Sequence, residues 1–101
     1  MIEYRFVYPA EEEMNEAASF YESAKAGLGT NFLDDVQYRV DTLCEYPYLG
    51  SAIGKGLRRV LLHRFPFNLI YSVEADAILI VAVAHHGRRP DYWKDRLKEL
   101  S

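Results

Sequence analysis

The chain has only one cysteine, Cys44, among its 101 residues. It therefore cannot form an internal disulfide, and a zinc site with four cysteine ligands is excluded. Cys44 falls on the apolar stripe of a predicted helix, so we expect a small buried hydrophobic side chain rather than a reactive thiol.

A membrane-spanning segment is also missing. The longest uninterrupted apolar run, residues 77–84, is far below the roughly 20 residues that cross a bilayer. Glu3 and Arg5 stand where a secretory signal would place its apolar region. We therefore expect a cytoplasmic protein with no membrane partner.

Several catalytic motifs are absent as well. The segments "GLG" (27–29) and "GSAIGKG" (50–56) lack the spacing of a Walker or dinucleotide-binding loop. There is no G-x-S-x-G elbow and no H-E-x-x-H pair, so ordinary hydrolase and zinc-protease functions have little support. We expect no cofactor.

The charge is divided unevenly along the chain. Residues 1–54 hold 3 Lys and Arg against 10 Asp and Glu, whereas residues 55–101 hold 9 against 5, for a net charge of −3. The basic half could attract phosphates or an acidic protein segment, or the two halves could partly neutralise each other within the fold.

The first half of the sequence predicts a strand followed by two helices. Residues 2–8 are rich in β-branched and aromatic side chains, and Pro9 follows them. Residues 9–27 predict a helix that starts at the proline and stops at Gly27. Thr30 is the expected N-cap of a second helix that ends before Pro47. The expected apolar stripes are Met14, Ala17, Tyr21 and Ala24 on the first helix, and Leu33, Val36, Val40 and Leu43 on the second.

Five acidic residues fall largely off these stripes: Glu12, Glu16, Asp34, Asp35 and Asp41. We interpret them as a solvated face rather than as paired catalytic carboxylates, because nothing in the sequence brings two of them together in a cleft.

The second half predicts a loop, three strands and a short helix. The loop covers residues 48–56, and the strands are expected at 57–65, 67–74 and 77–85. The connections between them are short, so neighbouring strands should be antiparallel. The last strand is apolar on both faces, which suits a central strand that pairs with residues 2–8. Pro90 and the helical spacing of Trp93, Leu97 and Leu100 predict a short terminal helix.

The order β-α-α-β-β-β, with a final helix, predicts one α+β domain over residues 1–101. Its helical hairpin should pack on a small, mainly antiparallel twisted sheet.

Candidate chemistry gathers in "HHGRRPDYW" (85–93), directly after the central strand. Successive residues of a strand point to opposite faces, so His85 and His86 should not reach one metal ion together, and we expect no metal site. Together with Asn68 and the arginines of residues 57–65, this segment could form a basic, aromatic-flanked concavity for phosphate. The segment could equally cap the sheet with solvated arginines, and physical arguments alone favour that by a modest margin.

The motifs resemble a known family. "GLGTNFL", "YPYLG", "LRRVLLHRFPFNLIYSV" and "ILIVAVAHHGRRPDYW" are similar to segments of the RelE/ParE superfamily of type II toxin-antitoxin toxins, many of them called plasmid stabilisation proteins. The resemblance covers nearly the whole chain. It implies a toxin held inactive by a cognate antitoxin, through which alone it would contact operator DNA.

The resemblance also implies site residues. Arg59, His86, Arg89 and, more loosely, Tyr92 match catalytic positions of members that cut mRNA on the ribosome, and Arg58, Arg64 and Arg88 are the expected RNA phosphate contacts. Asn68 and Leu61 replace the arginine and lysine that nuclease members carry, and asparagine has no fixed charge to offset phosphate.

Three functions follow from the resemblance. The first is a metal-independent endoribonuclease, or mRNA interferase, acting on the ribosome. The second is a non-enzymatic, ParE-like inhibitor of DNA gyrase, which needs no nuclease site. The third is a degenerate toxin that retains only antitoxin binding.

Overall fold

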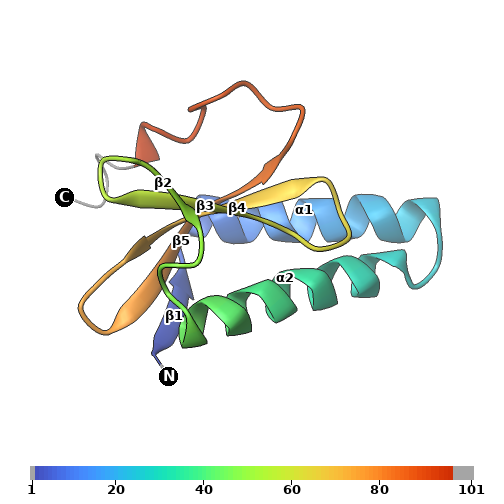
Figure 1. Cartoon of the computed structure of the whole chain (residues 1–101). Helices are drawn as coiled ribbons and strands as arrows, with labels where there is room; N and C mark the ends of the chain where they lie inside the picture. The colour runs from blue at the N-terminus through green and yellow to red at the C-terminus, as the bar shows by residue number, and fades with distance from the viewer. Residues whose placement is uncertain (1, 97–101) are drawn as a thin grey trace.

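The computed structural model describes residues 2–96. Its elements are β1 (Glu3–Phe6), α1 (Tyr8–Ala24), α2 (Leu28–Glu45), β2 (Ser51–Gly54), β3 (Leu57–Leu61), β4 (Phe67–Val73) and β5 (Ala77–His85). The strands form one sheet in the order β1-β5-β4-β3-β2, in which β1 runs parallel to β5 and the other neighbours are antiparallel. The helical hairpin packs on one face of this sheet (Figure 1). The predicted α+β fold is confirmed, with one strand more than expected.

β5 is the buried centre of the sheet, and its bounds match the prediction. It lies between β1 and β4, as expected from its apolar character, and Phe6 of β1 pairs with Ile80. Ile80 belongs to the main core beneath the helices, whereas Val81 and Ala82 belong to a second apolar cluster on the opposite face. Both faces of β5 are therefore covered.

The helix boundaries differ from the prediction at the turn between the helices. Gly27 has a φ of 88° and immediately precedes α2, so Thr30 lies inside that helix and is not its N-cap. Phe32 is fully buried while Leu33 is 37% exposed, so the stripe expected to begin at Leu33 begins at Phe32 instead. Ala24, expected on the α1 stripe, is exposed.

Asp35 is buried, at 5% exposure, which contradicts its assignment to a solvated face. Its carboxylate accepts backbone N–H bonds from His63, Arg64 and Phe65 at 2.8–3.2 Å. These three amides belong to the turn after β3, which ends at Leu61 rather than at Phe65 as predicted. Asp35 therefore ties this turn to α2.

The loop predicted over residues 48–56 contains an edge strand, which is a further correction. Ser51 pairs with Arg59 and Ala52 with Arg58, so β2 joins β3. All four residues of β2 are exposed or half-buried, and such a strand shows no apolar alternation in the sequence.

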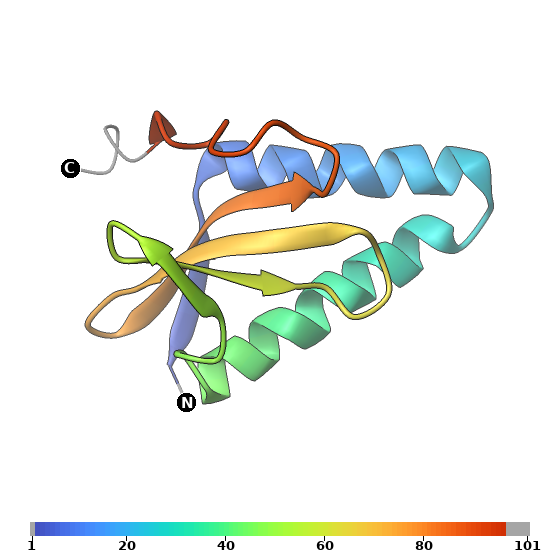
Figure 2. The same ribbon diagram turned by 45° about the horizontal axis from the view of Figure 1, so that its top comes forward.

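The segment after β5 forms turns where a helix was expected. Residues 90–95 are turns, and Asp91 has a positive φ of 62°. The stripe positions Leu97 and Leu100 lie outside the described residues. Trp93 is buried in the second apolar cluster. In Figure 2 the segment, coloured red, runs back toward the N-terminal end of α1. Within residues 2–96, no helix is both long and apolar enough to cross a bilayer.

Candidate functional site

A cleft of about 190 Å³ lies on the sheet face away from α2, at the end of β5. It is lined by Ile53, Arg59, Asn68, Ile70, Ala84, His85, His86, Arg88, Arg89, Pro90, Asp91, Tyr92 and Trp93. The second apolar cluster forms its floor, and the segment after β5 forms one wall.

Strand alternation brings the residues of this cleft together. Asn68 pairs with Ala84 on β5, and Arg59 pairs with Ile70, so these side chains share one face of the sheet. His86 follows the last residue of β5, and its backbone N–H donates to the Pro66 carbonyl at 2.9 Å. The register of three strands thus positions one arginine, one amide and one imidazole at the cleft.

The two histidines have different surroundings. The His85 ring packs edge-on against Phe67 at 5.1 Å between centroids, and its Nδ1 accepts from the Gly87 N–H at 2.8 Å. Phe67 belongs to the main core, so His85 leans toward the helix side of the sheet. No group of three His, Cys, Asp or Glu side chains suited to a metal ion occurs in residues 2–96. His86 is also exposed and lines the cleft.

The cleft is strongly cationic. Three arginines, Arg59, Arg88 and Arg89, line it against one carboxylate, Asp91. The Oδ1 atom of Asn68 is buried and has no hydrogen-bond donor within residues 2–96. The three guanidinium groups suit an anion such as a phosphodiester, because they bind phosphate oxygens with paired N–H donors, whereas the Asn68 oxygen can only accept from a donor.

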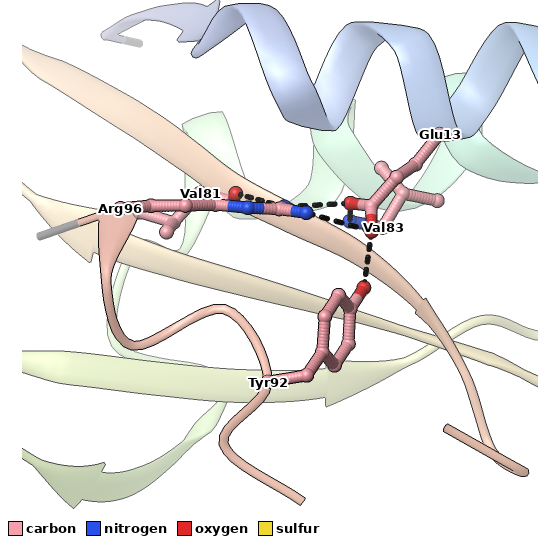
Figure 3. A network of polar contacts seen from close by, with 5 residues as sticks. All are labelled: Glu13, Val81, Val83, Tyr92 and Arg96. Carbon is pink, nitrogen blue, oxygen red and sulfur yellow. Dashed lines mark hydrogen bonds and ion pairs between the residues drawn. The ribbon is translucent and has the colours of Figure 1, made fainter. Parts of the chain in front are cut away.

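Tyr92 is held by Glu13 and lines the cleft with its ring. Its hydroxyl donates to the Glu13 carboxylate, which lies on α1 (Figure 3). The Arg88 guanidinium lies over the ring, 3.9 Å from its centroid. Burial raises the pKa of Tyr92, and the hydrogen bond and negative charge of Glu13 raise it further. The hydroxyl is therefore poorly suited to be an acid or base in the cleft.

Glu13 joins α1, β5 and the C-terminal segment. Besides the Tyr92 hydroxyl, it accepts from the Val83 N–H at 3.0 Å and from both terminal nitrogens of Arg96 at 2.8 and 3.0 Å. Arg96 also donates to the Val81 carbonyl at 3.0 Å (Figure 3). These contacts satisfy backbone groups of Val81 and Val83 on the part of β5 that extends beyond its pairing with β1.

Sequence reasoning missed Glu13, although a signal for it was present. Glu13 lies three residues after Ala10 and four before Ala17, which places it on the inner face of α1. A carboxylate on the apolar stripe of a helix becomes buried and then needs hydrogen-bond donors. The sequence could therefore have identified Glu13 as a buried carboxylate with partners elsewhere in the fold. Asp35, three residues after Phe32 on α2, carries the same signal.

Five of the seven predicted site residues line the cleft: Arg59, His86, Arg88, Arg89 and Tyr92. Arg58 points elsewhere, because it donates to the Gly50 carbonyl at 2.6 Å and stacks on Tyr48 at 5.0 Å. Arg64 is exposed in the turn held by Asp35. The geometry gives neither Arg58 nor Arg64 a place in the cleft.

The chain is similar to known toxins. Residues 4–90 match the family model described as ParE toxin of type II toxin-antitoxin system, parDE. No curated protein sequence is significantly similar.

Two solved structures share the fold. A chain of the chromosomal ParDE toxin-antitoxin system from P. aeruginosa is 18% identical, with a TM-score of 0.60, covering 84% of this chain and 96% of its own. The isolated E. coli RelE toxin is 14% identical, with a TM-score of 0.65, and both chains are fully covered.

Proposed function

Because the chain belongs to the ParE family of toxins from type II toxin-antitoxin systems, we propose that it arrests growth by cleaving mRNA on the ribosome through its cationic cleft. The observation that carries this proposal is the convergence of Arg59, from β3, with His86 and Arg89, from the segment after β5, around one small cavity. The family implies an antitoxin partner that restrains the toxin. Translating ribosomes are cytoplasmic, so the protein should act in the cytoplasm.

The chemistry needs no metal ion. His86 takes the proton from a ribose 2′-hydroxyl, whose oxygen attacks the adjacent phosphorus. The bond to the 5′-oxygen breaks, and that oxygen leaves with a proton supplied by His86 or by water. Arg59 and Arg89 stabilise the charge that develops on the phosphate oxygens. The products are a 2′,3′-cyclic phosphate and a 5′-hydroxyl end.

Induced expression without the antitoxin tests the proposal. The wild-type chain should stop growth and leave new mRNA ends within translated regions. His86→Ala and Arg89→Ala should abolish both effects. His63→Ala and Arg64→Ala are matched controls, because both residues are exposed and lie outside the cleft, and they should remain toxic. Growth arrest with unchanged messages would reject the nuclease.

A ParE-like inhibitor of DNA gyrase is the second candidate. Three observations favour it: Asn68 brings no charge to the cleft, Leu61 is an exposed leucine where nuclease members carry lysine, and the Tyr92 hydroxyl is bonded to Glu13. In this case the purified chain should block supercoiling by gyrase while messages stay intact. If expression does not slow growth at all, the chain is a degenerate toxin that retains antitoxin binding.

A further inference from the structure

β1 leaves one edge of the sheet open. Within residues 2–96 it pairs only with β5, and no strand lies on its other side. This edge is opposite the one formed by β2, and no residue of β1 lines the cleft. An unpaired strand edge presents N–H and C=O groups with which another chain can pair.

The backbone of Tyr4 points out of this edge. The Val7 N–H donates to the Ile80 carbonyl of β5 at 3.0 Å, and backbone groups of successive strand residues alternate in direction. Tyr4 is three residues before Val7, so its N–H and C=O point away from β5. The Ile2 N–H follows the same alternation, because it donates to the Cys44 carbonyl of α2 and not to β5. β1 can therefore pair with a further strand at Tyr4.

The side chains of β1 are divided between the two faces of the sheet. Tyr4 is 39% exposed and lies on the helix side, where its hydroxyl is 3.5 Å from Oε1 of Gln37 and its ring packs edge-on against Phe6. Glu3 and Arg5 alternate with Tyr4, so they share the opposite face, and both are exposed. Neither forms an ion pair with another group of residues 2–96.

The sequence of β1 is complementary to itself. When two copies pair antiparallel about Tyr4, Glu3 of each copy lies opposite Arg5 of the other. Ile2 of each copy then lies opposite Phe6 of the other, so apolar side chains meet on the helix side. A register centred on Glu3 or on Arg5 would instead place like charges opposite each other, which is unfavourable. The charges of β1 therefore select one register.

We propose that the chain forms a homodimer in which the β1 strands of two copies pair antiparallel about Tyr4. The Tyr4 N–H of each copy donates to the Tyr4 carbonyl of the other, and two pairs of Glu3 with Arg5 flank this point. The same residues of both copies meet across a two-fold axis, so the interface is isologous. The axis is perpendicular to the sheet, so both helical hairpins lie on one side and both clefts on the other. The dimer does not depend on whether the cleft cleaves RNA.

Sedimentation equilibrium of the purified chain tests for the dimer. A strand of four residues buries less surface than the roughly 1,200 Å² of a standard interface, so we expect a dissociation constant of about 10–100 µM. The average mass should rise from 11.7 kDa toward twice that value as the concentration approaches about 1 mM. A chain that remains monomeric at this concentration would overturn the proposal.

Charge reversal identifies the interface. Arg5→Glu and Glu3→Arg each place like charges opposite each other at both flanking pairs, and each should raise the dissociation constant at least about tenfold. An equimolar mixture of these two variants restores opposite charges and should associate about as tightly as the wild-type chain, which also shows that both variants fold. Arg64→Glu, in the exposed turn after β3, is the charge-matched control and should dimerise as the wild type does. A mixture that associates no better than the separate variants, or an equal loss for the control, would show that the copies do not meet at β1.

Hydrogen exchange of the wild-type chain at low and high concentration gives a second readout, which requires no variant. The Tyr4 amide points outward in the monomer, so its exchange should slow as the dimer forms. The Arg5 amide points toward β5 and should change little, which makes it an internal control. Unchanged exchange at Tyr4 in a chain that dimerises would contradict the strand pairing.

Discussion

Glu13 is the residue that links the helical hairpin to the wall of the cleft. Its carboxylate holds Tyr92 and Arg96 from the C-terminal segment and the Val83 N–H of β5. The Arg96 and Glu13 side chains are only 18% and 15% exposed, so this ion pair is screened little by solvent. The shape of the cleft therefore depends on a residue that does not line it.

Glu13→Ala should lower the free energy of unfolding by about 3 kcal/mol, because it leaves a mostly buried guanidinium and a backbone N–H without an acceptor. Glu13→Gln keeps one acceptor oxygen and should cost less. Glu12→Ala is the control, since Glu12 is exposed, and its effect should stay within about 0.5 kcal/mol. Urea unfolding of the three variants measures these differences, and equal losses for Glu12 and Glu13 would contradict the network.

The raised pKa of Tyr92 predicts a loss of stability in alkali. Burial and Glu13 favour the neutral phenol in the folded state. Its contribution is fully present below the unfolded pKa of about 10 and is lost as the pH rises toward the folded pKa. Unfolding in urea at about pH 8 and about pH 11 should therefore show a decline that is smaller in Tyr92→Phe. An identical decline in both proteins would rule out Tyr92 as its source.

For single residues, the motifs that resemble the RelE/ParE superfamily predicted the residues of the cleft better than arguments from residue type alone did. Arg59, His86 and Arg89 were singled out from the sequence, and the strand register brings them to one cleft. The partners of Glu13 and Asp35 could not be predicted in the same way. Their donors are backbone amides and side chains distant in sequence, and no periodicity identifies these.

At the scale of elements, the hairpin of α1 and α2 depends on a close contact at its turn. The Glu22 carboxylate accepts from the N–H groups of Gly27 and Gly29 at 3.0–3.1 Å. A Cβ atom at Gly29 would lie 2.5 Å from the Ala18 carbonyl oxygen. Only glycine lets the two helices approach this closely.

Gly29→Ala should therefore lower the free energy of unfolding by about 1–3 kcal/mol, because the helices must separate to admit the methyl group. Thr30→Ala, the next residue of α2, is exposed and should change it by no more than about 0.5 kcal/mol. Thermal unfolding followed by circular dichroism compares the two variants. A Gly29→Ala protein as stable as the wild type would mean that a methyl group fits between the helices without separating them.

The elements that sequence reasoning predicted correctly have clear apolar patterns. β5 is apolar throughout, and its bounds were predicted without error. The predictions for residues 51–54 and for residues 90–95 were wrong, for different reasons. β2 is a short edge strand with little to bury. Residues 90–95 follow a proline and contain a tryptophan, as a helix start would, but Asp91 takes a left-handed conformation and turns the chain back over the sheet.

At the scale of the whole molecule, the acidic and basic halves of the sequence lie on different parts of the fold. The acidic first half supplies both helices, and the basic second half supplies the cleft at the far face of the sheet. An anionic ligand is attracted to the cleft and repelled by the hairpin. The net charge of −3 therefore conceals a cationic site.

RNA binding should consequently weaken as salt rises, since phosphate contacts release counterions. Arg59→Ala should reduce the slope of log affinity against log salt by about one, whereas Arg64→Ala should leave it unchanged. Fluorescence polarisation with single-stranded RNA over a salt series measures both slopes. Equal slopes for wild type and Arg59→Ala would remove Arg59 from the phosphate site.

The proposed nuclease activity requires that the cleft around His86 cut mRNA during translation. Primer extension on a defined message in a translating extract tests it most directly. We expect new 5′ ends at a constant position within codons. They should depend on ribosomes, be lost with His86→Ala and be retained with His63→Ala. An intact message in the presence of a chain that still arrests growth would contradict it.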